Sequence, residues 1–455
     1  MGTVLEQLAT LAEGLTVDDI PDEVMREARR RLLDGLGCML GGVRGRPVQS
    51  VFDAVGRDSG TSTLVGDSRR ASAAEAALAN ATALRYLDFM DGHPGPYPCH
   101  PSLLIPAVLA AAEHAGASGA EVARAIVLGY ELDIRLQIGS GDPDITAHGW
   151  SGSTNLGLAI PFATGGMLGL SESQVADAMA IATVHAPTLD ASGRGQMAES
   201  KSCVDGMVAM SSVTATLLAG HGLGGKLAAF EGEDGFVPAL AKHFEEDIVL
   251  APLDRFRILD AYTKYFNAVK CGQSAAAAVL ELRPRLAGPE DVERIIVRFA
   301  ERDWRNQSND ASARRRPQNR DTANHSAVYC VAAALVEGDL QSEQFEPEHL
   351  TDPRILDIID RIVLEPDPAL TAHWPGANPA SIEIVTISGE TLSATTIHSP
   401  GHPRNPLSDE QIEAKFRVLA AASLEPAAIE AVIAQVRQLD TLTDIGSLMS
   451  LVSSK

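Results

Sequence analysis

Residues 19–36, DIPDEVMREARRRLLDGL, have the pattern of a helix with one buried face. Asp19 and Pro21 are typical of a helix start, and apolar residues then recur at every fourth position. These are Val24, Ala28, Leu32 and Leu36. Because a helix is stabilised mainly by packing its apolar stripe against neighbours, the stretch predicts a packed helical domain around it.

The sequence has helical patterns on both sides of this stretch, from residue 1 to about 266. Capping boxes precede apolar periodic runs at Ser72/Glu75, Ser118/Glu121 and Ser171/Gln174. The runs are rich in Ala and Gly, whose small side chains let helices approach closely. We therefore predict a compact, all-helical domain over residues 1–266.

After residue 266 the pattern changes to β-branched segments. We expect strands at 293–299 (ERIIVRF), 358–365 (IIDRIVLE), 382–387 and 392–397, the last two joined as a hairpin. Helices are expected between them, at about 273–284 and 323–336. Residues 267–404 are therefore predicted to form a smaller α+β domain.

The C-terminal segment returns to a helical pattern. A fourth capping box, Ser408/Gln411, opens it. Two helices are too few to form a domain, so we expect residues 405–455 to pack back onto the first domain. The predicted fold class is mainly α, with a large all-helical domain and a smaller α+β domain.

Composition restricts the classes of protein that this chain can be. Its 455 residues, 45% of them hydrophobic, exclude a disordered chain and a small disulfide-stabilised scaffold. A net charge of −23 disfavours nucleic acid and membrane surfaces as partners. Five scattered Cys indicate reduced thiols, and acidic residues interrupt any signal-peptide pattern near the N-terminus. We expect a soluble, cytoplasmic protein in which the uncharged run 149–171 is a buried helix with a loop.

The densest polar cluster lies in the proline-rich segment 88–101. It carries Asp88, Asp91, His93 and His100, and a rigid loop of carboxylates and imidazoles suits general acid/base chemistry. The alternatives are that these groups only cap a helix, or that they bind zinc or iron as in a metallohydrolase.

Two further segments carry candidate groups. His148 and Ser151 precede an uncharged helical run, where helix-start N–H groups bind a carboxylate or Ser151 simply caps the helix. Lys201 precedes an apolar helix, where burial and the helix dipole would lower its pKa and suit it to proton transfer. A solvated lysine is the alternative reading.

An arginine run, Arg314 to Arg316 followed by Arg320, provides a local excess of positive charge in an acidic chain. It could bind a substrate carboxylate, and we name Arg316 as the candidate. A solvated loop is the alternative.

Eight stretches, in the right order and with similar spacing, resemble the 2-methylcitrate dehydratase (MmgE/PrpD) family, which also includes cis-aconitate decarboxylase and iminodisuccinate epimerase. They are 33–42, 86–101, 129–135 (GYELDIR), 150–157, 201–225, 231–236, 322–331 (TANHSAVYCV) and 406–416. The resemblance implies a homodimer with an interdomain active site that uses neither metal nor cofactor. It also implies catalytic roles for Asp88, His100 and Lys201.

The sequence departs from the family pattern at several of its polar positions. Met90 replaces an aspartate, and Gly92 stands where a threonine is usual. Ser151 replaces a histidine, for which His148 is a possible substitute. In the segment 264–273, Lys264 is retained and Lys270 is an additional cation. The proline and histidine-type positions of that segment are Asn267, Val269 and Gln273.

We therefore expect a cofactor-independent lyase, of dehydratase or decarboxylase type, acting on a small polycarboxylate. Lys201 would transfer a proton at the carbon next to a carboxylate, with Asp88, His100 and His148 as catalytic partners. The substrate ligands would be Asp91, Ser151, Lys264, Lys270 and Arg316. The alternatives are an isomerase or epimerase that uses the same site, and a carboxylate-binding homologue without catalysis.

Overall fold

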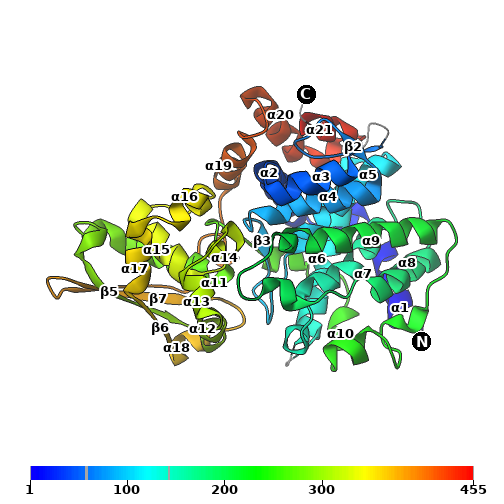
Figure 1. Cartoon of the computed structure of the whole chain (residues 1–455). Coiled ribbons are helices and arrows are strands. Elements are labelled where there is room, and N and C mark those ends of the chain that lie inside the picture. The colour runs from blue at the N-terminus through cyan, green and yellow to red at the C-terminus, as the bar shows by residue number, and fades with distance from the viewer. Residues whose placement is uncertain (1, 57–59, 142–143, 454–455) are drawn as a thin grey trace.

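A computed structural model describes residues 2–56, 60–141 and 144–453. It confirms the predicted mainly α fold, with a large helical domain beside a smaller domain that contains a sheet (Figure 1). One hydrophobic core contains residues up to Ala261 and from Leu407 onward, and a second core spans Phe266 to Ala394.

The helical domain is built around α4 (Ala73–Tyr86), which packs against α2 (Asp22–Gly42), α5 (Ile105–Ala115) and α9 (Val204–Gly220). Its other helices are α1 (Val4–Gly14), α3 (Arg46–Val55), α6 (Gly119–Gly139), α7 (Leu156–Thr164), α8 (Glu172–His185) and α10 (Glu246–Val249). The four predicted capping boxes are all formed, at Ser72, Ser118, Ser171 and Ser408. α2 itself begins at Asp22, directly after Pro21.

The C-terminal helices complete this domain. α19 (Asp409–Ala420) packs along α2, and α20 (Pro426–Arg437) and α21 (Gly446–Leu451) follow it (Figure 1). Lys415 on α19 reaches inward, where its Nζ donates to the carbonyls of Phe89 at 2.7 Å and Lys264 at 3.0 Å. The returning helix therefore ties together two segments that are 175 residues apart in the sequence.

The smaller domain contains a four-stranded sheet in the order β6-β5-β7-β8. β5 (Val292–Phe299) pairs in parallel with β6 (Ile362–Pro366) and antiparallel with β7 (Ala380–Thr386), which forms the predicted hairpin with β8 (Thr391–Thr396). α11 (Lys270–Leu282) packs on this sheet, and α15 (Ala327–Glu337) packs on α11. The remaining helices are α12 (Glu301–Ser308), α13 (Ala311–Arg315), α14 (Arg320–Asn324), α16 (Pro347–Leu350), α17 (Pro353–Asp360) and α18 (Pro368–Thr371).

One predicted strand begins later than expected. Residues 358–360 of the expected strand 358–365 end α17, and β6 starts only at Ile362. Asp352 caps this helix and Pro353 occupies its first position, so both residues favour a helix start at this point of the chain. Ile355, Ile358 and Ile359 then have the helical spacing that places β-branched side chains in the core.

Two apolar segments pack inside the helical domain. α7, from the uncharged run 149–171, is buried along its whole length, as predicted. Among the described residues one helical segment, Glu199–Gly220, has the length and hydropathy of a membrane span. It packs against α4, α7 and α8, and core helices of soluble proteins have the same length and composition.

Candidate active site

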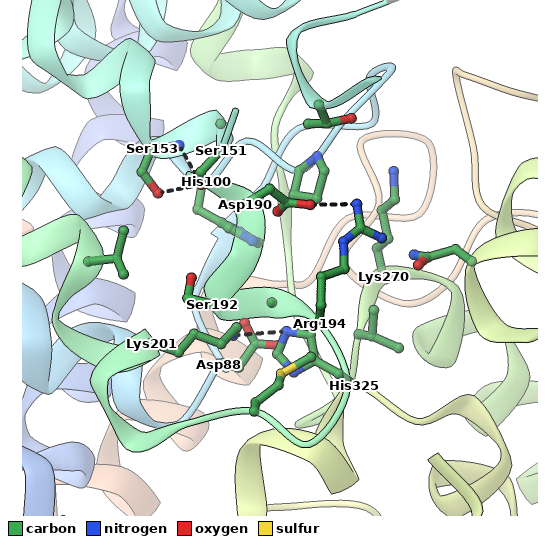
Figure 2. Close-up of a pocket in the computed structure, with 18 of the residues that line it drawn as sticks. Asp88, His100, Ser151, Ser153, Asp190, Ser192, Arg194, Lys201, Lys270 and His325 are labelled. Atoms are coloured by element: carbon green, nitrogen blue, oxygen red, sulfur yellow. Dashed lines mark hydrogen bonds and ion pairs between the residues drawn. The ribbon is translucent and has the colours of Figure 1, made fainter. Parts of the chain in front are cut away.

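A cavity of about 350 Å³ lies between the two domains. The helical domain contributes Asp88, His100 and Lys201 to its lining, and the smaller domain contributes Lys270 and His325 (Figure 2). The short ladder between β3 (Asp91–Gly92) and β4 (Tyr262–Thr263) joins the loop after α4 to the chain that enters the smaller domain. This pairing brings groups from distant parts of the sequence to one place.

Asp88 is the most strongly bound carboxylate in the cavity. Its Oδ2 accepts from Lys264 Nζ at 2.7 Å, and its Oδ1 accepts from Arg85 in the last turn of α4. Burial alone would raise the pKa of Asp88, but the charges of Lys264 and Arg85 hold it well below its usual value. Its backbone has a φ of 53°, a left-handed conformation that is unusual for a non-glycine residue and is held here by these bonds.

Lys201 lies in the short 3₁₀ helix Glu199–Cys203 that leads into α9, and its side chain is buried. Burial, with the Arg85 charge as the next cause, lowers the pKa of Lys201 to about 8. The amine therefore changes its protonation state close to neutral pH, as the sequence predicted for a proton-transferring lysine.

His325 faces Lys201 from the other domain (Figure 2). Its Nδ1 donates to the carbonyl of Asp321 at 2.8 Å, so its Nε2 carries a lone pair and accepts from Lys201 Nζ at 3.2 Å. Burial and the Lys201 charge hold the pKa of His325 well below its ordinary value, which keeps the imidazole neutral. We name Arg85, Asp88, Lys201, Lys264 and His325 the charged cluster.

His100 lines the cavity as a hydrogen-bond acceptor. Its Nδ1 donates to the carbonyl of Asp91 at 2.7 Å, so its Nε2 carries a lone pair, which accepts no hydrogen bond among the described residues. Burial, together with the charges of Lys264 and Arg85, lowers the pKa of His100 to about 3. His100 is therefore a neutral hydrogen-bond acceptor over the physiological range.

Positive charge exceeds negative charge in the lining. Eight cationic side chains line the cavity: Arg85, Arg194, Lys201, Lys264, Lys270, Arg302, Arg305 and Arg314. Five carboxyl groups line it: Asp88, Asp133, Asp190, Asp205 and Asp303. In a chain of net charge −23, this local excess favours an anionic ligand.

The structure brings together six of the nine predicted site residues. Asp88, His100, Ser151, Lys201, Lys264 and Lys270 all line the cavity. Ser151 caps a 3₁₀ turn, with its Oγ accepting from Ser153 N at 3.3 Å. Lys264 is bonded to Asp88, so its charge is already neutralised before a substrate arrives.

Three predicted residues do not reach the cavity. Asp91 is fully buried behind it, where its carboxylate accepts from Tyr130 Oη at 2.5 Å and from Ser102 N at 3.2 Å. His148 ends the 3₁₀ helix Ile145–His148 with its side chain exposed to solvent. Arg316 is half exposed and pairs with Asp360 at 2.7 Å, and it is Arg314 of the same run that lines the cavity.

Other lining residues were not predicted as site residues. His325 lies within residues 322–331, one of the eight stretches that resemble the family. The family resemblance was therefore the sequence feature that could have indicated it. Arg85, Asp133 and Tyr262 also line the cavity. Tyr262 belongs to no predicted motif, whereas Asp133 lies in the quoted stretch 129–135.

Two of the departures from the family pattern have a structural explanation. A side chain at Gly92 would place its Cβ 2.4 Å from Tyr262 Oη, so the tyrosine fills the room that a threonine would need. Gln273 is buried and bonds backbone groups of the segment 265–268, among them Phe266 O at 2.7 Å. Gln273 therefore stabilises the backbone of residues 265–268, at a position where the family pattern has a histidine. Val269 lines the cavity as an apolar residue.

The geometry of the segment 88–101 does not match the alternative of a zinc or iron site. Across the residues that the structure describes, no three or more His, Cys, Asp or Glu side chains are grouped to hold a metal ion. His93, one of the proposed ligands, is buried with its Nδ1 2.5 Å from Gln137 Oε1. The Asp88 carboxylate is bonded to Lys264 and Arg85 instead.

The fold and the cavity define a class of two-domain protein with a cationic interdomain site. Residues 6–248 match the MmgE/PrpD N-terminal domain and residues 266–441 match the MmgE/PrpD C-terminal domain. The chain belongs to the MmgE/PrpD family.

Relatives of the chain include several decarboxylases. Cis-aconitate decarboxylase of Mus musculus is 28% identical over 478 residues, covering 99% of this chain and 93% of the relative. The Homo sapiens enzyme of that name is 28% identical, covering 99% and 94%. The Aspergillus terreus enzyme is 25% identical, covering 99% and 96%. Family and relatives together support a lyase.

Proposed function

We propose that the chain is a cofactor-independent lyase that decarboxylates a small polycarboxylate, with cis-aconitate as the first candidate substrate. The observation that carries the proposal is the Lys201–His325 pair beside the ionised Asp88, inside a cavity with excess positive charge. The decarboxylase names of the relatives support this choice over a dehydratase.

Decarboxylation makes a specific demand on such a site. When a carboxylate leaves as carbon dioxide, its bonding electron pair stays on the substrate, and a proton must be added to carbon. Each turnover therefore consumes one proton. Lys201, whose pKa is lowered to about 8, is charged at neutral pH and weak enough as a base to release its proton.

The other members of the charged cluster position Lys201. His325 Nε2 holds one of the ammonium hydrogens, which fixes the direction of Nζ. Asp88, held by Arg85 and Lys264, keeps a negative charge near the ammonium group without accepting its proton. Lys270, Arg194 and Arg314 are the cations that we assign to the substrate carboxylates.

The deciding experiment follows carbon dioxide release and solvent deuterium. Purified protein is incubated with cis-aconitate, citrate, methylcitrate, malate and an amino-diacid in D₂O. We expect carbon dioxide from cis-aconitate and one deuteron in each product molecule. Deuterium exchange into substrate without elimination would indicate an isomerase, and thermal stabilisation without turnover would indicate a binding protein.

We further propose that the chain functions as a homodimer. Five of the nine exposed large apolar side chains among the described residues lie between residues 184 and 223, on and beside α8 and α9. They are Val184, Leu189, Met207, Leu218 and Leu223. Exposed apolar side chains concentrated on and beside two packed helices support association with a second copy.

Light scattering tests the homodimer proposal. The wild type should have twice the mass of the 48.0 kDa chain, and Met207→Lys/Leu218→Lys should reduce it to one chain. A monomeric wild type would contradict the proposal.

A further inference from the structure

Asp133 is a buried carboxyl group that lines the cavity and has no cationic partner among the described residues. It lies in the last third of α6 and is 2% exposed. Its Oδ2 accepts from the thiol of Cys99 at 3.1 Å. Within the described part of the chain, no Lys, Arg or His nitrogen lies within 4.0 Å of its oxygens, and no other side chain bonds to it.

The other four carboxyl groups of the cavity have stronger donors. Asp88 accepts from Arg85 and Lys264, Asp190 pairs with Arg194 at 2.6 Å, Asp205 lies 3.4 Å from Arg85, and Asp303 accepts from Asn378 at 2.8 Å. Asp303 also lies in the first turn of α12, where the helix dipole favours a negative charge. Asp133, far from the N-terminus of its helix, has neither kind of support.

The surroundings of Asp133 disfavour its ionisation. Burial raises the pKa of Asp133 to about 7, against a smaller lowering by the Cys99 thiol. The carboxyl groups that act on it are Asp91 on β3 and Asp205 on α9, and both raise the pKa of Asp133 further. Tyr97 and Cys99, on the loop beside it, are neutral because burial raises the pKa of each well above its ordinary value.

We propose that Asp133 binds the substrate as a neutral carboxylic acid, donating its O–H to one of the substrate carboxylates. The donor is Oδ1, because Oδ2 is occupied by Cys99. This inference rests on the proposed function, since it needs a polycarboxylate in the cavity. It assigns to the site a hydrogen-bond donor that is not a cation, at a residue to which the family resemblance gave no role.

The assignment has a measurable consequence. An ionised Asp133 would repel the substrate carboxylate, so the substrate binds the protonated form and raises its proton affinity further. Above the midpoint near pH 7, substrate affinity should fall about tenfold for each pH unit, and binding should take up a proton from solvent.

Calorimetric titration with tricarballylate, a saturated tricarboxylate, tests this between about pH 6.5 and 9, where most of the ligand is fully ionised. We expect the wild type to show a loss of affinity with a midpoint near pH 7. Asp133→Asn keeps the size and a donor group but cannot ionise, so it should retain only the loss near pH 8 that Lys201 causes. Asp303→Asn, the matched control, should keep the midpoint near pH 7 whatever its affinity.

A second measurement requires no variant. Wild-type titrations at about pH 7.5 in two buffers of different ionisation enthalpy give the number of protons taken up, which should lie between about 0.5 and 1. Zero uptake, or a midpoint near pH 7 that persists in Asp133→Asn, overturns this inference alone. Failure of the wild type to bind tricarballylate and cis-aconitate at any of these pH values overturns the proposed function together with it.

Discussion

The charged cluster and four other residues that line the cavity are held in different ways. In the charged cluster, Asp88 is bonded to Arg85 and Lys264, and Lys201 is bonded to His325. We name Asp133, Ser151, Tyr262 and Val269 the uncharged lining. There, Asp133 has only a thiol partner, and among the described residues the Tyr262 hydroxyl has no hydrogen bond.

This difference separates two tasks. The charged cluster is preorganised, because its ion pairs fix the groups before a substrate arrives. It contains Asp88 and Lys201, and His100, the third catalytic residue implied by the family resemblance, lines the same cavity. The uncharged lining includes Ser151 and Val269, where family histidines are replaced. We infer that the cluster carries the proton chemistry and that the lining selects the substrate.

Removal of Asp88 should disrupt the charged cluster and cause the largest loss of stability. Asp88→Ala removes the carboxylate partner of the buried Lys264 and leaves Arg85 only its longer pair with Asp205, so the free energy of unfolding should fall by about 3–5 kcal/mol. Urea denaturation measures this. Asp360→Ala removes the solvent-exposed pair with Arg316 and should cost about 1 kcal/mol or less. Equal losses in the two variants would contradict a preorganised cluster.

Asp133→Asn tests whether Asp133, in the uncharged lining, is neutral in the folded protein. The folded-state pKa of Asp133, about 7, is above the ordinary value of 3.8, so its contribution to stability is complete below pH 4 and is lost as pH rises to 7. Relative to Asp133→Asn, the wild type should lose up to about 4 kcal/mol of unfolding free energy across that window. Denaturation at several pH values measures the difference. A constant difference would show that Asp133 is ionised throughout.

His325→Ala tests whether the cluster depends on both domains. Loss of the acceptor at Nε2 releases the direction of Lys201 Nζ, so kcat should fall by up to about a hundredfold while KM changes little. Steady-state kinetics with the active substrate measure both. His325→Gln keeps an acceptor group and should recover part of the rate, and an unchanged kcat in His325→Ala would remove His325 from the mechanism.

The smallest expected effect concerns Gly92 and Tyr262. Gly92→Ala forces its Cβ against Tyr262 Oη, which should cost about 1–3 kcal/mol of stability. Thermal denaturation measures it, with Gly92→Ala/Tyr262→Leu as the variant in which the clash is absent. If the double variant recovers no stability, Tyr262 does not occupy the place of a family threonine side chain.

The sequence predicted the local features well and the interdomain ones poorly. The capping boxes depend on residues three apart, and all four are formed. Asp88 and His100 share one loop, so their proximity could be predicted. His325 lies 124 residues from Lys201 and in the other domain, and no spacing rule connects them.

Short-range geometry explains the predicted residues that lie away from the cavity. α13 is a five-residue helix, and its end sends Arg314 inward and Arg316 outward although they are two positions apart. The closeness of His148 to Ser151 in the sequence predicts that both line the site, but a 3₁₀ turn directs His148 to solvent. The direction of a side chain in such short turns is set by tertiary contacts.

The most direct test of the central claim is the kcat of Lys201→Ala with the active substrate at saturation, beside Lys226→Ala, an exposed lysine outside the cavity. If Lys201 delivers the proton, kcat should fall by at least about a hundredfold in Lys201→Ala and stay unchanged in Lys226→Ala. A Lys201→Ala enzyme within a few-fold of wild type would contradict the account.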